Sequence, residues 1–110
     1  MRTVFQVEKV DHLSEHDIYI IGRALDAIEV GSVVFGISKN EVSFFREENV
    51  VENRMVDAHS FSRVPTFTVV KIVMYERSVE SVARGYTAGI YLHREDQSQS
   101  LELKWLAKRD

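Results

Sequence analysis

The sequence predicts an all-β domain, a closed antiparallel barrel of six or seven strands. β-Branched and aromatic residues are frequent along the 110-residue chain, and proline occurs once, at Pro65. Short apolar or alternating segments are separated by polar turns at close spacing, which is typical of barrels. Closure also removes exposed strand edges, which favour aggregation in so β-rich a chain. We expect residues 1–110 to form a single domain.

The first half of the chain contains strand patterns joined by turns. Alternation predicts a strand that begins at Thr3, and the polar stretch 12–17 is typical of a turn. The next segment is apolar enough to be partly buried on both faces. A bend at residues 27–31 contains Gly31, because glycine tolerates backbone conformations that other residues avoid. The strands expected here are residues 3–8, 18–25, 32–37 and 41–46.

The connection at about residues 38–65 is the least regular part of the sequence. Its apolar residues follow neither a helical nor a strand period, so a short helix and an irregular hairpin both fit; we favour a loop with some strand. If the loop folds back, its apolar side chains cap the barrel. If it does not, they form an exposed patch suited to a protein partner or a second copy. These candidate interface residues are Phe44, Phe45, Val50, Met55 and Phe61.

The second half contains the clearest strands. In the segment 66–75, Val70, Ile72 and Met74 fall on one face, and the other face is also mostly apolar, which predicts a strand covered on both sides. A polar connection at residues 93–100 precedes a last strand. In the two final strands, the residues expected to share a face are Ala88, Ile90 and Leu92, then Leu101, Leu103 and Trp105.

Composition narrows the function classes. The absence of cysteine excludes disulfides, a thiolate nucleophile and a cysteine-based zinc site, and it agrees with a reducing compartment, so we expect a cytoplasmic protein. The 14 basic and 17 acidic residues are interspersed and give a net charge of −3, which predicts weak non-specific nucleic-acid affinity and no DNA binding. No segment approaches the roughly 20 apolar residues that span a membrane, and no secretory signal is expected.

Two segments carry glycines at informative spacing. The first contains Gly22-Arg23, a short turn and an apolar-x-Val-Gly segment; the second contains an Ala-Arg-Gly bend and a Gly-apolar pair. Both resemble the second domain of the translational GTPases, the β-barrel that follows the nucleotide-binding domain in elongation factor Tu. The resemblance implies that Gly85 permits a sharp bend and that Gly89 lets a neighbouring backbone approach closely. Its fold-defining residues are Gly22, Arg23, Gly31, Met74, Gly85 and Gly89.

The chain also departs from this pattern. Ala27 stands where the family has a glycine, the connection before Thr66 is longer, and a further strand follows His93. No G-x-x-x-x-G-K-[ST] loop occurs, so we expect no GTP binding by that route. In the family this barrel contacts tRNA or ribosomal RNA, which makes an RNA- or ribosome-associated module the alternative function.

The residue types used in catalysis or metal binding do not occur in arrangements that favour either role. His12 and His16 are four positions apart, which suits a metal site on a helix, but they lie in a predicted turn. His59 and His93 are isolated in polar segments, where solvated side chains are the simpler interpretation. We expect no catalytic residues, no metal site and no cofactor. A barrel that binds a small ligand or flavin is a third possibility, without a phosphate-binding element to support it.

Arginines and tyrosines could gather at one end of the barrel as an RNA-binding face, because arginine binds phosphate and tyrosine stacks on bases. Nearby acidic residues would cancel much of the positive field, so we favour a structural role for them. The candidate RNA contacts are Arg77, Arg84, Arg94, Tyr86 and Tyr91. The sequence therefore favours a non-catalytic binding module, most of all a protein–protein interaction or oligomerisation domain.

Overall fold

The computed structural model describes residues 2–38, 65–94 and 103–109, and all regular structure in these ranges is β-strand. This part of the chain contains no helix capable of crossing a bilayer. The predicted all-β class is confirmed, while the predicted strand at 41–46 lies outside the described residues. The strands are β1 (Arg2–His12), β2 (Asp17–Ala24), β3 (Ile28–Glu29), β4 (Val33–Ser38), β5 (Thr66–Met74), β6 (Arg77–Val79), β7 (Ser81–Val82), β8 (Thr87–His93) and β9 (Leu103–Lys108).

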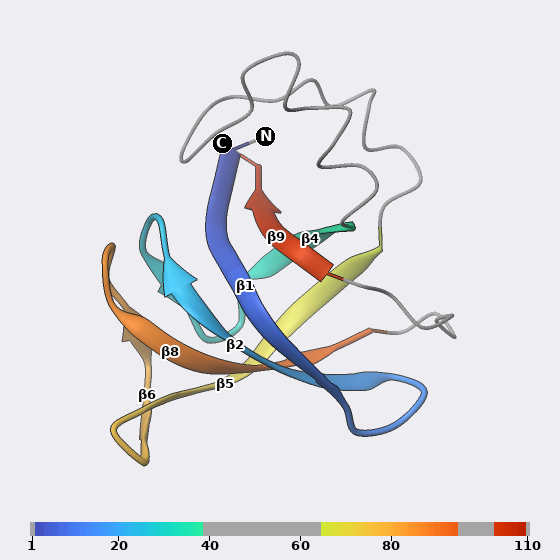
Figure 1. Ribbon diagram of the computed structural model, residues 1–110, viewed down its shortest axis with the longest axis horizontal. Helices are drawn as coiled ribbons and strands as arrows, with labels where there is room; N and C mark the ends of the chain where they lie inside the picture. Colours follow the sequence, from blue (N-terminus) through green and yellow to red (C-terminus); the bar gives the residue numbers. More distant parts are fainter. Residues whose placement is uncertain (1, 39–64, 95–102, 110) are drawn as a thin grey trace.

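Six of these strands pair in an antiparallel ring (Figure 1). Their order is β4-β9-β1-β2-β8-β5, and β5 pairs with β4 to complete the ring. β6 continues from β5 as a hairpin, and β3 pairs with β7 in a separate two-stranded sheet. The predicted barrel-like antiparallel arrangement is therefore confirmed.

The interior of the ring is an apolar core to which every ring strand contributes. The prediction that Ala88, Ile90 and Leu92 share the inner face of β8 is confirmed, because all three are buried. The small sheet adds Ile28 and Val82 to the same core. Burying one large apolar side chain stabilises the fold by about 1.5–3 kcal/mol relative to leaving it exposed. The largest buried side chains in the other ring strands include Phe5, Ile20, Ile37, Ile72 and Leu106.

A bulge in β5 changes which residues face the core. Val69 pairs with Leu92 and Lys71 pairs with Tyr91, so Val70 has no partner in β8. An extra residue in one strand moves the following side chains to the opposite face. Val70 is consequently 53% exposed although Ile72 is completely buried. The prediction that these two residues share a face, in a strand covered on both sides, is wrong.

A second bulge alters the last strand in the same way. Ile37 pairs with Trp105 and Ser38 pairs with Leu103, which leaves Lys104 without a partner in β4. Leu103 is buried, whereas Trp105 is only partly buried. The prediction that Leu103 and Trp105 share a face is wrong for this reason, and Leu101 lies outside the described residues.

Two of the glycines singled out by the resemblance are required by backbone conformation. Gly31 and Gly85 have φ values of +91° and +93°, and a Cβ at either position would meet open space. Gly85 lies in the bend before β8, where its N–H donates to the Ala24 carbonyl oxygen at 2.7 Å. The predicted bend is confirmed. Of the other residues in that set, Arg23 is exposed on β2 and Met74 packs partly buried against the core.

At two further positions the neighbouring atoms leave no space for any side chain, so glycine is required. A Cβ at Gly22 would clash with the carbonyl oxygen of Gln6 on the neighbouring strand, and a Cβ at Gly89 would clash with the hydroxyl group of Tyr19. The expectation that Gly89 admits a neighbouring backbone is therefore wrong, because the close neighbour there is an aromatic side chain. The close backbone approach occurs at Gly22.

The β5–β6 hairpin turns through residues that rarely adopt its conformation. Met74 pairs with Arg77, which leaves Tyr75 and Glu76 as the two central residues. Their φ values are 50° and 64°, and both are positive as in the mirror-image turns that glycine and asparagine favour. Tyr75 is 85% exposed, so no packing explains its place in the turn.

Candidate functional site

A groove of about 480 Å³ lies on the outer face of the ring beside β4. Val34 and Phe67 are buried in the core, so their neighbours along β4 and β5 face outward. The antiparallel pairing of Phe35 with Thr66 joins the two strands at this place. The end of β9 borders the same groove. We define the β4 groove as Val33, Phe35, Thr66, Lys108 and Arg109.

The β4 groove combines an apolar wall with two cations. The guanidinium carbon of Arg109 lies 5.5 Å from the centroid of the Phe35 ring, within range of a cation–π contact. Neither Lys108 nor Arg109 forms an ion pair with a carboxylate in the described ranges. Val33 is 50% exposed beside them. This arrangement suits a ligand that carries an apolar group next to a negative charge.

The β4 groove was not predicted from the sequence. β4 contains Val33, Val34 and Phe35 in succession, so apolar residues point both inward and outward and no alternation marks the outer face. The groove borders the two strands that lead into and out of the connection at residues 39–64. The candidate interface residues within that connection, from Phe44 to Phe61, lie outside the described residues.

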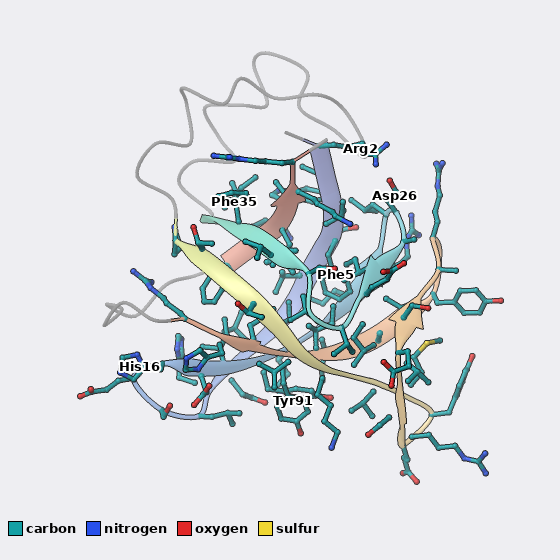
Figure 2. The ribbon with its side chains drawn as sticks, turned by 180° about the vertical axis from the view of Figure 1, so that it is seen from behind. Arg2, Phe5, His16, Asp26, Phe35 and Tyr91 are labelled. Carbon is teal, nitrogen blue, oxygen red and sulfur yellow. The ribbon has the colours of Figure 1, made fainter. Side chains whose placement is uncertain are left out.

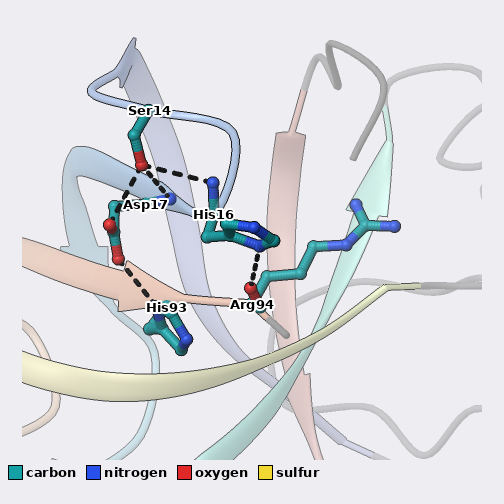
Figure 3. A network of polar contacts seen from close by, with 5 residues as sticks. All are labelled: Ser14, His16, Asp17, His93 and Arg94. Atoms are coloured by element: carbon teal, nitrogen blue, oxygen red, sulfur yellow. Dashed lines mark hydrogen bonds and ion pairs between the residues drawn. The ribbon is translucent and has the colours of Figure 1, made fainter. Parts of the chain in front are cut away.

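A second group of polar residues lies where β2 begins and β8 ends (Figure 3). The turn between β1 and β2 is organised by Ser14, whose Oγ accepts hydrogen bonds from the backbone N–H groups of His16 and Asp17 at 3.2 and 3.1 Å. The same hydroxyl donates to Asp17 Oδ2 at 3.0 Å. Serine commonly closes turns in this way.

Two histidines join this turn to the end of β8. His93 Nδ1 lies 2.8 Å from Asp17 Oδ1, and His16 Nδ1 lies 3.0 Å from the Arg94 carbonyl oxygen. The Arg94 N–H donates to the His16 carbonyl oxygen at 2.7 Å. The hydrogen bond from His93 lowers the pKa of Asp17, and the bond from Ser14 adds to this effect. The two imidazole rings lie with their centroids 6.0 Å apart.

This network has the residue types of a serine hydrolase but not the geometry. Nucleophilic catalysis requires a serine hydroxyl that gives its proton to a histidine, whereas Ser14 donates to Asp17. No cluster of three or more potential metal ligands occurs in the described part of the chain. The network fixes the turn against the end of β8. His16, expected to be a turn residue, and His93, expected to be isolated and solvated, are brought together by strand register, which no local sequence signal reveals.

The candidate RNA contacts do not gather at one end of the barrel. Arg84 and Tyr86 precede β8, whereas Arg94 follows it, so a whole strand separates them. Arg77 lies on β6. Tyr91 lies on β8 (Figure 2), where it pairs with Tyr19 on one side and Lys71 on the other. Its ring centroid is 4.5 Å from that of Tyr19 and 5.5 Å from Lys71 Nζ. These residues therefore do not form one cluster, and an RNA contact by any of them stays a prediction.

Comparison with known proteins assigns no family to this chain. No protein-family model matches it. No curated protein matches its sequence significantly. The resemblance to the second domain of the translational GTPases consequently rests on the glycine-containing segments and stays a prediction.

Proposed function

We propose that this chain is a non-catalytic protein-binding module whose docking surface is the β4 groove. The observation that carries the proposal is an outward-facing apolar wall beside two cations that have no carboxylate partner in the described ranges. Unpaired cations at the rim of an apolar surface steer and select partners of opposite charge. We also propose that the module works in the cytoplasm, in keeping with the absence of cysteine.

The partner that fits this surface is a protein segment with an apolar side chain flanked by acidic residues. The apolar side chain would pack against Val33 and Phe35, and the acidic groups would face Lys108 and Arg109. An aromatic ring already held beneath a guanidinium group offers a rigid anchor that loses little entropy on binding. A second copy of the chain and an RNA are alternative occupants that the experiment separates.

The test is a pull-down from host lysate, with and without nuclease, using matched surface variants. Val33→Glu puts a charge into the groove, whereas Val70→Glu puts the same charge at an equally exposed valine that does not line it: the two are 50% and 53% exposed. The double variant Lys108→Glu/Arg109→Glu reverses the charge of the rim. Sedimentation at several concentrations reports self-association separately.

The proposal predicts that partner proteins are still retained after nuclease treatment, both by the native protein and by Val70→Glu. Val33→Glu and the charge-reversed variant should bind these partners with an affinity about tenfold lower. Retention that disappears with nuclease would support the RNA-associated alternative instead. Equal retention by all variants would remove the groove as the docking surface. A coloured purified sample would indicate a small-ligand or flavin-binding barrel and contradict the proposal.

A further inference from the structure

A row of four side chains crosses the outer face of four neighbouring ring strands. Asp11 of β1 pairs with Tyr19 of β2. Tyr91 of β8 pairs with Tyr19 on one side and with Lys71 of β5 on the other. Figure 2 shows Tyr91 directed away from the interior of the ring. We define the tyrosine row as Asp11, Tyr19, Tyr91 and Lys71.

Two β-bulges place the charged ends of this row on the outer face. In β1 the register shifts after Val7, which is buried, so the later residue Asp11 points outward instead of into the core. In β5 the register shifts after Val69, also buried, and Lys71 becomes exposed for the same reason. A carboxylate therefore lies at one end of the row and an ammonium group at the other.

The centre of the tyrosine row is aromatic and partly open to solvent. Tyr19 and Tyr91 alternate with buried residues along β2 and β8, and their ring centroids lie 4.5 Å apart. Lys71 Nζ lies 5.5 Å from the centroid of the Tyr91 ring. Ile21 and Val73, which share the adjacent row, are also only partly buried. Tyrosine rings held by their neighbours offer a large contact area at little cost in side-chain entropy.

The order of its charges makes the tyrosine row complementary to itself. A two-fold axis parallel to the strands, between β2 and β8, brings the row against a second copy in reverse order. Tyr19 then faces the partner's Tyr91, and Asp11 faces the partner's Lys71. An acidic or a basic partner of another kind would match only one end of the row, whereas a second copy matches both.

We propose that the tyrosine row is the interface of a two-fold symmetric homodimer. The ring curves away from the axis on both sides, so the aromatic rings form the central contact. The long, flexible side chain of Lys71 spans the wider gap at each end. This inference does not rest on the proposed function, because none of the residues of the β4 groove lies on β2 or β8.

The test is sedimentation equilibrium of the native protein and of charge-reversed variants, from about 5 to about 500 µM. Lys71→Glu brings two carboxylates together in each contact, and Asp11→Lys brings two ammonium groups together. An equimolar mixture of these two variants pairs a carboxylate with an ammonium group again in both contacts. Arg84→Glu makes the same reversal of charge at an exposed arginine outside the row. Circular dichroism shows that each variant folds.

We expect the native protein and Arg84→Glu to dimerise with a dissociation constant on the order of 10–100 µM. Lys71→Glu and Asp11→Lys should each dimerise at least about tenfold more weakly, because the two-fold axis repeats every repulsive contact. Their mixture should recover the native affinity to within about threefold. Val33→Glu, which alters the β4 groove, should leave dimerisation unchanged.

Three outcomes would overturn the homodimer. The first is a native protein that stays monomeric over the whole concentration range. The second is a mixture of the two variants that associates no better than either variant alone. The third is association that Val33→Glu abolishes and Lys71→Glu preserves, which would place self-association in the β4 groove instead.

Discussion

The ring of Tyr19 covers Gly89 on the outer face of the barrel, in the space that a Cβ at residue 89 would need. In the pairing of β2 with β8, Tyr19 lies opposite Tyr91 and Ile21 lies opposite Gly89. The Tyr19 side chain therefore reaches Gly89 diagonally, from one strand to the next. Diagonal neighbours lie within reach of aromatic side chains. The glycine and the tyrosine therefore act as one packing unit.

Gly89→Ala should lower the free energy of unfolding by about 1–3 kcal/mol, because the added methyl group displaces the Tyr19 ring. Urea denaturation measures this change. In a Tyr19→Ala background the same substitution should cost little, since the obstructing ring is gone. An equal cost in both backgrounds would show that the ring is not the obstacle.

The β5–β6 turn should be improved by residues suited to positive φ. Replacing Tyr75 by Asn and Glu76 by Gly should raise the free energy of unfolding by about 1 kcal/mol, because it relieves two positive-φ conformations. Tyr75 is 85% exposed, so its removal sacrifices little packing. Thermal and urea unfolding report the gain.

Glu80→Gly is the matched control for that change. Glu80 is exposed and lacks a positive φ, so glycine there should only add freedom to the unfolded chain and lower stability by up to about 1 kcal/mol. A similar gain at both places, or a loss in the turn variant, would contradict the assignment of strain to Tyr75 and Glu76.

The bulge in β5 predicts unequal costs for neighbouring apolar residues. Ile72→Ala should destabilise the fold by about 2–5 kcal/mol, because Ile72 is completely buried. Val70→Ala should change stability by less than about 0.5 kcal/mol, since its side chain faces solvent. Chemical denaturation of the two variants measures both losses of stability. A large loss for Val70→Ala as well would contradict the bulge and support a regular alternation along β5.

Asp17 should make stability depend on pH in the acidic range. Its pKa is lowered below the ordinary 3.8, chiefly by the hydrogen bond from His93, so the folded state binds its proton less readily than the unfolded state does. The resulting stabilisation is present above the unfolded pKa and is lost as pH falls through the folded value. The difference in stability between the native protein and Asp17→Asn should therefore shrink from pH 6 to about pH 3.

Asp11→Asn supplies the control for this pH series. Asp11 lies on the same hairpin, where its carboxylate forms an ion pair with Lys9 Nζ at 3.9 Å. Its replacement removes a hairpin carboxylate but keeps the bond between Asp17 and His93, so the comparison isolates the effect of that bond. If the Asp17→Asn difference were constant across the acidic range, the His93 bond would not be the source of the lowered pKa.

The existence of most strands could be predicted from the sequence, because apolar and β-branched residues cluster between polar turns. The faces of β5 and β9 could not, since Val70 and Lys104 are bulge residues whose extra position is defined only against the partner strand. The polar network of Ser14, His16, Asp17, His93 and Arg94 could not be predicted from the sequence either. Asp17 and His93 are 76 positions apart and meet only through the register of β2 with β8.

β9 occupies the place between β1 and β4 in the ring, although it is the last ring strand to be synthesised. Until residues 103–108 have left the ribosome, the facing edges of β1 and β4 have no partner. A nascent chain in that state exposes two strand edges at once, the condition in which β-rich proteins pair with the wrong neighbour. Completion of this barrel therefore waits for the synthesis of residues 103–108, and its most vulnerable moment comes just before that.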